Sequence, residues 1–155
     1  MGQPRHALLE IMTFQDVFEQ HWLPAKPLSS DRKDGSYKRR TRAKALEHAY
    51  IETNPLAMRS LIVTDHDGVE ADWQADLAGL PQPSWIALNP LKGSGHIGYA
   101  LKDPVCLTNA ARRTPVNLLA RVEQGLMDVL GGDIGYGGRI TKNPTHPAHT
   151  PIWGD

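Results

Sequence analysis

Three short polar motifs contain the residues of this sequence whose types and spacing could support chemistry. Asp65-His66-Asp67 follows an apolar run, Ser94-Gly95-His96 precedes another, and Asp133 follows a long amphipathic stretch. Because side chains alternate between the faces of a strand, Asp65 and Asp67 are expected on one face and His66, with a structural role, on the other. Two carboxylates at a strand end favour Mg²⁺ or Mn²⁺. A simple turn at Asp67-Gly68 explains this one motif about as well.

The second motif begins a strand that is expected to place His96, Gly98 and Ala100 on one face and core residues on the other. Apart from the imidazole that face is nearly bare, so a flat or bulky group could lie close to the backbone there. Ser94 and the glycine-flanked turn, with its accessible N–H groups, favour binding of a triphosphate, and Lys92 adds a positive charge. A histidine that only bonds a nearby carbonyl is the ordinary alternative.

Asp133 and the cations that follow it could complete such a site. A third carboxylate just past the glycine pair at residues 131–132 could swing towards the other two, although alone it is an ordinary loop residue. The glycines at 135–138 predict a close backbone approach, either to a ligand or within a tight turn. Arg139 and Lys142 supply two positive charges shortly afterwards.

A basic segment lies between Arg32 and Lys44, where seven cations are accompanied by one acid, Asp34. Such a density of charge could hold a phosphate backbone, and the solvated face of a surface helix is an equally good explanation. The zero formal net charge of the whole chain argues against a strongly basic nucleic-acid-binding protein. The residues predicted to contact DNA are Arg39, Arg40, Arg42 and Lys44.

Composition limits the classes of protein that this chain can belong to. Its 155 residues predict one domain, and 40% hydrophobic residues with a mean hydropathy of -0.42 indicate a soluble globular protein. Neither a membrane span nor a signal peptide is visible. A single cysteine, Cys106, excludes an internal disulfide and a multi-cysteine zinc site, and it favours a cytoplasmic location.

Hydrophobic periodicity and turn signals predict a mixture of helices and strands. Helices are expected over residues 14–22, 37–51 and 71–79, and a loop over 27–35. Strands are expected over 59–65, 85–88 and 96–101, the last two forming a hairpin. The best helix begins after Thr114 with Pro115 first, ends at Gly131, and has an apolar stripe made of Val116, Leu119, Val122, Leu126 and Leu130. With an irregular tail from Thr145, this predicts an α+β fold with an antiparallel-containing sheet backed by helices.

The motifs in this order resemble the catalytic signature of the archaeo-eukaryotic primase superfamily. Over residues 35–153 the chain is similar to the catalytic domain of plasmid replication initiators of the colicin-plasmid "replicase" type. Further shared motifs are Tyr50-Ile51-Glu52-Thr53-Asn54-Pro55, Asn89-Pro90, Gly95-His96-Ile97-Gly98-Tyr99-Ala100-Leu101 and Thr141-Lys142-Asn143-Pro144. Family members usually continue into a helical module and an origin-binding domain. We therefore expect residues 1–155 to be a catalytic domain, with 1–35 as an extension and the C-terminal DNA-binding module absent.

The resemblance implies a fold, a site and an activity. The fold would be an RRM-like antiparallel sheet with packed helices plus an N-terminal αβ unit, with the active site between them. Asp65, Asp67 and Asp133 would be catalytic ligands of two Mg²⁺ or Mn²⁺ ions. The residues expected to contact the nucleotide are Ser94 and His96 from the resemblance, with Lys92, Arg139 and Lys142 added for their charge.

The expected function is template-dependent nucleotidyl transfer that makes primers for plasmid or phage replication, by a primase or primase-polymerase. Its partners would be a single-stranded DNA template, NTP or dNTP substrates and a host DNA polymerase downstream, with no membrane. A metal-dependent nuclease built from the same carboxylates is the enzymatic alternative. A non-catalytic nucleic-acid-binding module that uses the basic segment is the other.

Overall fold

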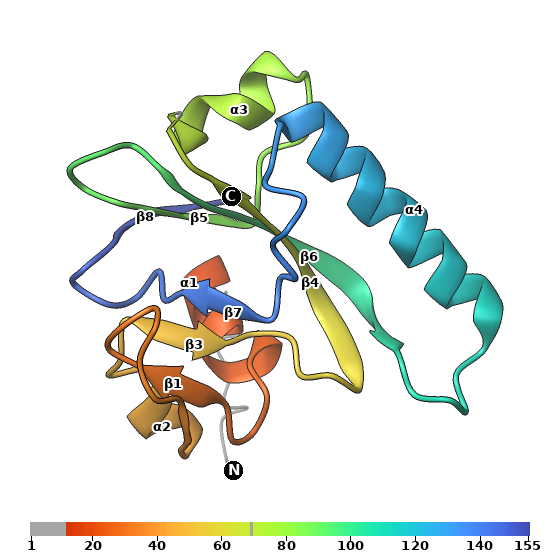
Figure 1. Cartoon of the computed structure of the whole chain (residues 1–155), viewed down its shortest axis with the longest axis horizontal. Helices are drawn as coiled ribbons and strands as arrows, with labels where there is room; N and C mark the ends of the chain where they lie inside the picture. The colour runs from red at the N-terminus through yellow and green to blue at the C-terminus, as the bar shows by residue number, and fades with distance from the viewer. Residues whose placement is uncertain (1–11, 69) are drawn as a thin grey trace, which may run out of the picture.

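The computed structural model describes residues 12–68 and 70–155, which form two antiparallel sheets and several helices (Figure 1); residues 1–11 of the predicted extension lie outside this part. The first sheet has the order β2-β1-β3-β7 and consists of β1 Leu28–Ser30, β2 Lys38–Arg39, β3 Tyr50–Glu52 and β7 Ile140–Lys142. The second has the order β4-β6-β5-β8 and consists of β4 Met58–His66, β5 Trp85–Leu88, β6 Gly95–Cys106 and β8 Thr150–Trp153. The helices are α1 Phe14–Val17, the π-helix η1 Phe18–Trp22, α2 Arg42–Ala45, α3 Ala71–Leu77 and α4 Arg113–Leu130. The predicted α+β class is confirmed.

The second sheet is covered on both faces. On one face Leu61 and Val63 of β4 pack with Phe18 of η1 and Ile51 of the first sheet. On the other face Ile97 of β6 and its neighbours pack against α3 and α4, which lie together on that side in Figure 1. The strands that carry the polar motifs are therefore held between two apolar layers.

The bare face of β6 is filled by the chain itself. Trp85 lies directly opposite Gly98 in the β5–β6 ladder, and its indole packs so close that a Cβ at Gly98 would overlap the ring. Trp85 is fully buried, and the ring of Phe18 meets it edge-on at 5.7 Å. The flat group that the sequence predicted beside this backbone is thus a core tryptophan of the same chain.

The elements with strong local signals form where the sequence predicts them. Residues 14–22 are helical, β4 and α3 match their predictions, and β5 and β6 make the predicted hairpin. Helix α4 ends at Gly131, whose φ of 71° is the expected left-handed cap. It begins at Arg113, two residues earlier than predicted. Its predicted apolar stripe is buried at Leu119 and Leu130, half-buried at Val116 and Leu126, and exposed at Val122.

Three predictions near the two ends of the chain are wrong. The segment predicted as a helix over residues 37–51 forms β2, the single turn α2 and β3, and the predicted loop over 27–35 contains β1. The cause is pairing with distant residues, since Tyr50 of β3 lies opposite Ser30 and also opposite Lys142. The tail is not irregular, because β8 pairs with β5. Short strands that depend on distant partners have weak local patterns.

Candidate active site

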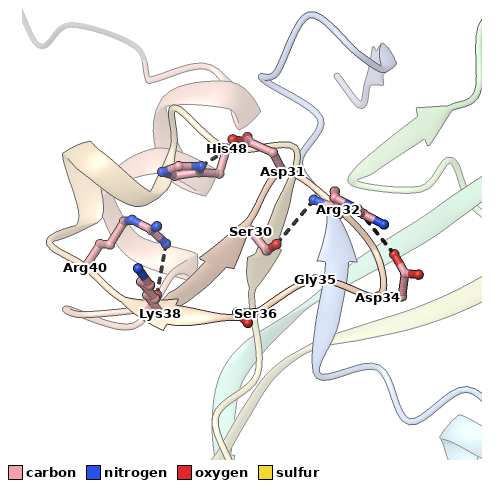
Figure 2. A pocket seen from close by; sticks show the side chains of 9 residues that line it. All are labelled: Ser30, Asp31, Arg32, Asp34, Gly35, Ser36, Lys38, Arg40 and His48. Carbon is pink, nitrogen blue, oxygen red and sulfur yellow. Dashed lines mark hydrogen bonds and ion pairs between the residues drawn. The ribbon is translucent and has the colours of Figure 1, made fainter.

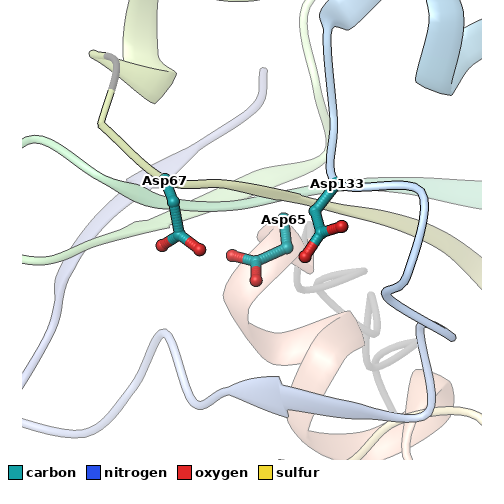
Figure 3. Close-up of side chains that lie close together, drawn as sticks. All are labelled: Asp65, Asp67 and Asp133. Carbon is teal, nitrogen blue, oxygen red and sulfur yellow. The ribbon is translucent and has the colours of Figure 1, made fainter.

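Three carboxylates from two separate segments converge at the end of β4. Asp65 and Asp67 come from β4 and the residue after it, and Asp133 comes from the segment between α4 and β7. One oxygen from each lies within 4.8 Å of the others, and Figure 3 shows all three side chains directed into the same space. Asp65 is buried, while Asp67 and Asp133 are exposed. The prediction that a third carboxylate swings towards the other two therefore agrees with the geometry.

Backbone hydrogen bonds bring Asp133 to this position. The N–H groups of Gly131 and Gly132 both donate to Met127, at 2.9 and 3.0 Å, and end helix α4. The Asp133 N–H then donates to the Asp65 carbonyl oxygen at 2.8 Å. One carboxylate oxygen of Asp133 accepts the Gly135 N–H at 2.8 Å, which leaves its other oxygen free to face the neighbouring carboxylates.

His96 lies beside the buried carboxylate of Asp65. It lies opposite Asp65 in the β4–β6 ladder, and its Nε2 is 3.2 Å from Asp65 Oδ1. Its Nδ1 accepts the backbone N–H of Lys142 at 2.9 Å, so a neutral ring must carry its proton on Nε2. Burial lowers the pKa of His96 to about 4, which makes the ring neutral near pH 7. Burial alone raises the pKa of Asp65, but His96 and the nearby lysines outweigh it, so the pKa falls and the carboxyl is ionised.

The donor set fits a divalent cation. Although Asp65 Oδ1 and His96 Nε2 are close, they are poorly aligned for a hydrogen bond, and neither has another partner among the described residues. A buried anionic oxygen without a well-formed bond is costly. Carboxylate oxygens are the ligands that Mg²⁺ and Mn²⁺ prefer, so a cation between these three side chains would satisfy the orphaned oxygen.

The residues predicted to contact a nucleotide divide into two groups. His96 and Lys142 lie beside Asp65, and Lys142 is nearly buried, which lowers the pKa of its ammonium. Ser94, also nearly buried, and the exposed Lys92 belong to the β5–β6 turn that leads into His96. Arg139 is not part of this group, because its Nε and Nη2 both lie 2.8 Å from Oε2 of Glu52.

The basic segment is not one face of a helix. Arg39 shares with Arg139 the fully buried carboxylate of Glu52, at 3.3 Å. Arg42 donates to the carbonyl oxygens of Gln20, Leu23 and Pro24, and Lys44 pairs with Glu47 at 3.2 Å. These three residues predicted to bind DNA therefore have partners within the protein, and so does the fourth, Arg40, which donates to Ser29 and Lys38.

The fourth, Arg40, lines a pocket of about 580 Å³ between β1, β2 and the loop that joins them (Figure 2). The lining residues are Ser30, Asp31, Arg32, Asp34, Gly35, Ser36, Lys38, Arg40 and His48. Arg32 lies 3.8 Å from Asp34, and His48 lies 3.0 Å from Asp31. Arg40 donates to the carbonyl oxygens of Ser29 and Lys38. Among the described residues neither Arg40 nor Lys38 forms an ion pair with Asp31 or Asp34, and the lining has three cations, Arg32, Lys38 and Arg40, against these two carboxylates.

Two residues of the site were missed by the sequence reasoning. The ring of Tyr136 lies 4.8 Å from that of His96, and its hydroxyl donates to the Ile140 carbonyl oxygen at 2.6 Å. An aromatic residue among five glycines was the available signal. Lys33, in the loop between β1 and β2, helps to lower the pKa of Asp65, and only the fold brings that loop to the carboxylates.

Comparisons with known proteins identify the family and the fold. The Replicase family model matches residues 22–155, a range that begins before the resemblance noted above. The fold is similar to the AEP domain of the primase-polymerase of cyanophage S-2L, with a TM-score of 0.53, 17% identity, and coverage of 76% of this chain and 72% of that one. No curated protein matches the sequence. None of the described helices is long and apolar enough to cross a membrane. Because the model match covers most of its length, this chain belongs to the Replicase family, and it has the fold of an archaeo-eukaryotic primase domain.

Proposed function

We propose that this chain is a template-dependent nucleotidyltransferase that makes primers for plasmid or phage replication, as a single catalytic domain. The family and the fold support a primase-like role in replication. The observation that carries the catalytic part is the convergence of Asp65, Asp67 and Asp133, whose oxygens lie within 4.8 Å of one another around an orphaned buried oxygen. A cytoplasmic host DNA polymerase would extend the products.

The residues around the carboxylates have distinct roles in this proposal. Two Mg²⁺ or Mn²⁺ ions held by Asp65, Asp67 and Asp133 would activate the attacking 3′-hydroxyl and stabilise the pyrophosphate leaving group. The Nε2–H of His96 donates to a phosphate oxygen, and the ammonium groups of Lys142 and of Lys92, on the exposed β5–β6 turn, balance phosphate charge. The protein contributes positioning and charge rather than a covalent intermediate.

The template is proposed to lie across the pocket of Figure 2. Arg40 and Lys38 form no ion pair with the lining carboxylates among the described residues, and the lining has more cations than carboxylates, which suits phosphates of a single strand. Arg39, Arg42 and Lys44 do not line this pocket, and each has a partner within the protein. Phosphate contacts carry no sequence information, so binding should fall steeply with salt and should not depend on template sequence.

A product assay distinguishes this function from its alternatives. The wild-type chain is incubated with single-stranded DNA, labelled NTP or dNTP, and Mg²⁺ or Mn²⁺, and both oligonucleotide and pyrophosphate are measured. We expect both products, in step with each other, and their loss in Asp67→Asn. The matched control is Asp103→Asn, an exposed carboxylate on β6, which should keep full activity.

The other outcomes reject the proposal. Metal-dependent cleavage of DNA without pyrophosphate would identify a nuclease. A non-catalytic binding module would bind DNA but form neither product with any tested template, nucleotide or metal. In that case the wild type and Asp67→Asn would bind DNA equally well.

A further inference from the structure

Asp133 belongs to a segment without helix or strand, which by itself would not fix the position of the Asp133 carboxylate. Residues 131–139 connect α4 to β7 without helix or strand, and five of them are glycine, the residue with the greatest backbone freedom. The start of the segment is fixed by the bonds between Asp133, Asp65 and Gly135. A catalytic constellation must be held within about 0.5 Å of its working geometry, so the far end of the segment also requires an anchor.

Arg59 contributes to that anchor. Its Nη1 donates to the carbonyl oxygen of Gly137 at 3.1 Å. Its Nε forms an ion pair with Oε1 of Glu123 on α4 at 3.2 Å, without the alignment of a hydrogen bond. A Cβ at Gly138 would lie only 3.1 Å from the same Nη1, so the guanidinium packs directly on the glycines. The two side chains are 20% and 28% exposed, which makes this pair better shielded than an ordinary surface ion pair.

Arg59 contacts both of the segments that supply carboxylates to the candidate cation site. Arg59 is on β4, the strand that leads to Asp65 and Asp67; it bonds the segment that carries Asp133; and through Glu123 it holds α4. A guanidinium is a cation with donors only and cannot ligate a metal ion, and the Cα of Arg59 is six residues before Asp65, roughly 20 Å along an extended strand. A cavity of about 260 Å³ lies beside it, between α4 and the glycine segment, and would give that segment room to move if the anchor were lost.

We infer that Arg59, together with Glu123, is a positioning residue that holds Asp133 against Asp65 and Asp67. The inference rests on the proposed cation site. A positioning role differs from a purely structural one in what it predicts. If Arg59 is a positioning residue, its loss weakens cation binding and loosens residues 131–139 specifically. Tyr136 bonds the same segment through its hydroxyl, but that bond reaches only four residues along the chain. Asn54 also ties the segment to β4, because its amide donates to Leu61 and to Gly138. Arg59 bonds Gly137, one residue closer to Asp133, and its ion pair with Glu123 links the segment to α4 as well.

The test measures Mn²⁺ affinity by electron paramagnetic resonance and amide hydrogen exchange over residues 131–139, neither of which needs activity. Arg59→Met should weaken Mn²⁺ binding about tenfold, the usual effect of losing a group that supports a metal ligand, and should speed exchange at Gly135 and Tyr136. Arg59→Lys keeps the charge but satisfies one partner at a time, so an intermediate loss is expected. The control is Arg121→Met, which changes an exposed arginine on α4, the helix that carries Glu123. This variant should match the wild type.

Asp133→Ala separates failure of this inference from failure of the proposed function. Unchanged Mn²⁺ affinity in Asp133→Ala would mean that the cation site itself is wrong. Weakened affinity in Asp133→Ala with wild-type affinity and exchange in Arg59→Met would reject the positioning role alone. If Arg59→Met does not fold, Glu123→Gln and Arg59→Lys decide: a loss of affinity in both supports the inference, and wild-type values in both overturn it.

Discussion

His96 has a single hydrogen-bond donor, and its neighbours determine where that donor points. The backbone N–H of Lys142 occupies Nδ1, so only the Nε2–H can be donated, and it faces Asp65 at 3.2 Å. A phosphate oxygen beside Asp65 would compete for the same N–H. The sequence predicted the histidine but not the partner that fixes its tautomer, since that partner is 46 residues away on β7.

At this scale we predict that His96→Ala weakens binding of a nucleoside triphosphate about tenfold, because a hydrogen bond to a charged group is worth about 1.5 kcal/mol. The measurement is a calorimetric titration with Mg²⁺ present, with thermal unfolding of each variant as a check on folding. His21→Ala, at an exposed histidine of η1, should bind as the wild type does. Unchanged affinity in a folded His96→Ala protein would make His96 a structural residue.

At the scale of elements, β6 combines a polar end with a tightly packed middle. His96 faces the carboxylates, and two residues later Gly98 receives the indole of Trp85. The sequence predicted this strand, its hairpin and the close approach at Gly98, because glycine, turn and alternation signals are local. It did not predict the occupant, which depends on the register of β5 against β6.

We predict that Gly98→Ala destabilises the protein by about 1–3 kcal/mol, the usual cost of overpacking a core. The matched control is Gly125→Ala on α4, where a Cβ would meet nothing within 4 Å. That change should stabilise the helix by up to about 1 kcal/mol. Urea unfolding measures both free energies, and equal effects of the two substitutions would show that Trp85 does not fill the Gly98 face.

Motif residues outside the carboxylates were harder to interpret from sequence, because their partners are remote. Arg139 was predicted to bind nucleotide, but it is held by Glu52, 87 residues away. Asn54 donates to the carbonyls of Leu61 and Gly138 and accepts the N–H groups of Ser60 and Leu61. Its position in a shared motif thus has a structural explanation, which no local pattern reveals.

At the scale of the whole molecule, the segment that contains β7 and β8 contributes a strand to each of the two sheets. β7 joins the first sheet and β8 the second, and between them His149 is buried, with its Nδ1–H donated to the carbonyl oxygen of Asn143 at 3.0 Å. Burial lowers the pKa of His149; the hydrogen bond to Asn143 raises it, but Lys142 and His146 nearby also lower it, so that the pKa in the folded state lies below its usual value.

This burial predicts a loss of stability in mild acid. In the unfolded chain His149 has a pKa of about 6.5, so below that pH the unfolded state binds a proton that the folded state does not. The stability that the neutral, buried His149 ring contributes is therefore fully present above pH 6.5. It is lost progressively as the pH falls towards the lower pKa of His149 in the folded state. Urea unfolding between pH 8 and 5.5 should show this fall. His149→Gln should reduce it, and the control His21→Gln should not; an unchanged slope in His149→Gln would contradict the assignment.

The three carboxylates must act together on a cation and a triphosphate for this chain to be a nucleotidyltransferase. Crystals grown with Mn²⁺ and a non-hydrolysable nucleoside triphosphate test this directly, since the anomalous signal of manganese locates it independently of the protein. We predict a peak at about 2.0–2.2 Å from oxygens of Asp65, Asp67 and Asp133, with the triphosphate beside it and next to His96 and Lys142. A bound triphosphate whose manganese contacts none of these carboxylates would contradict the account.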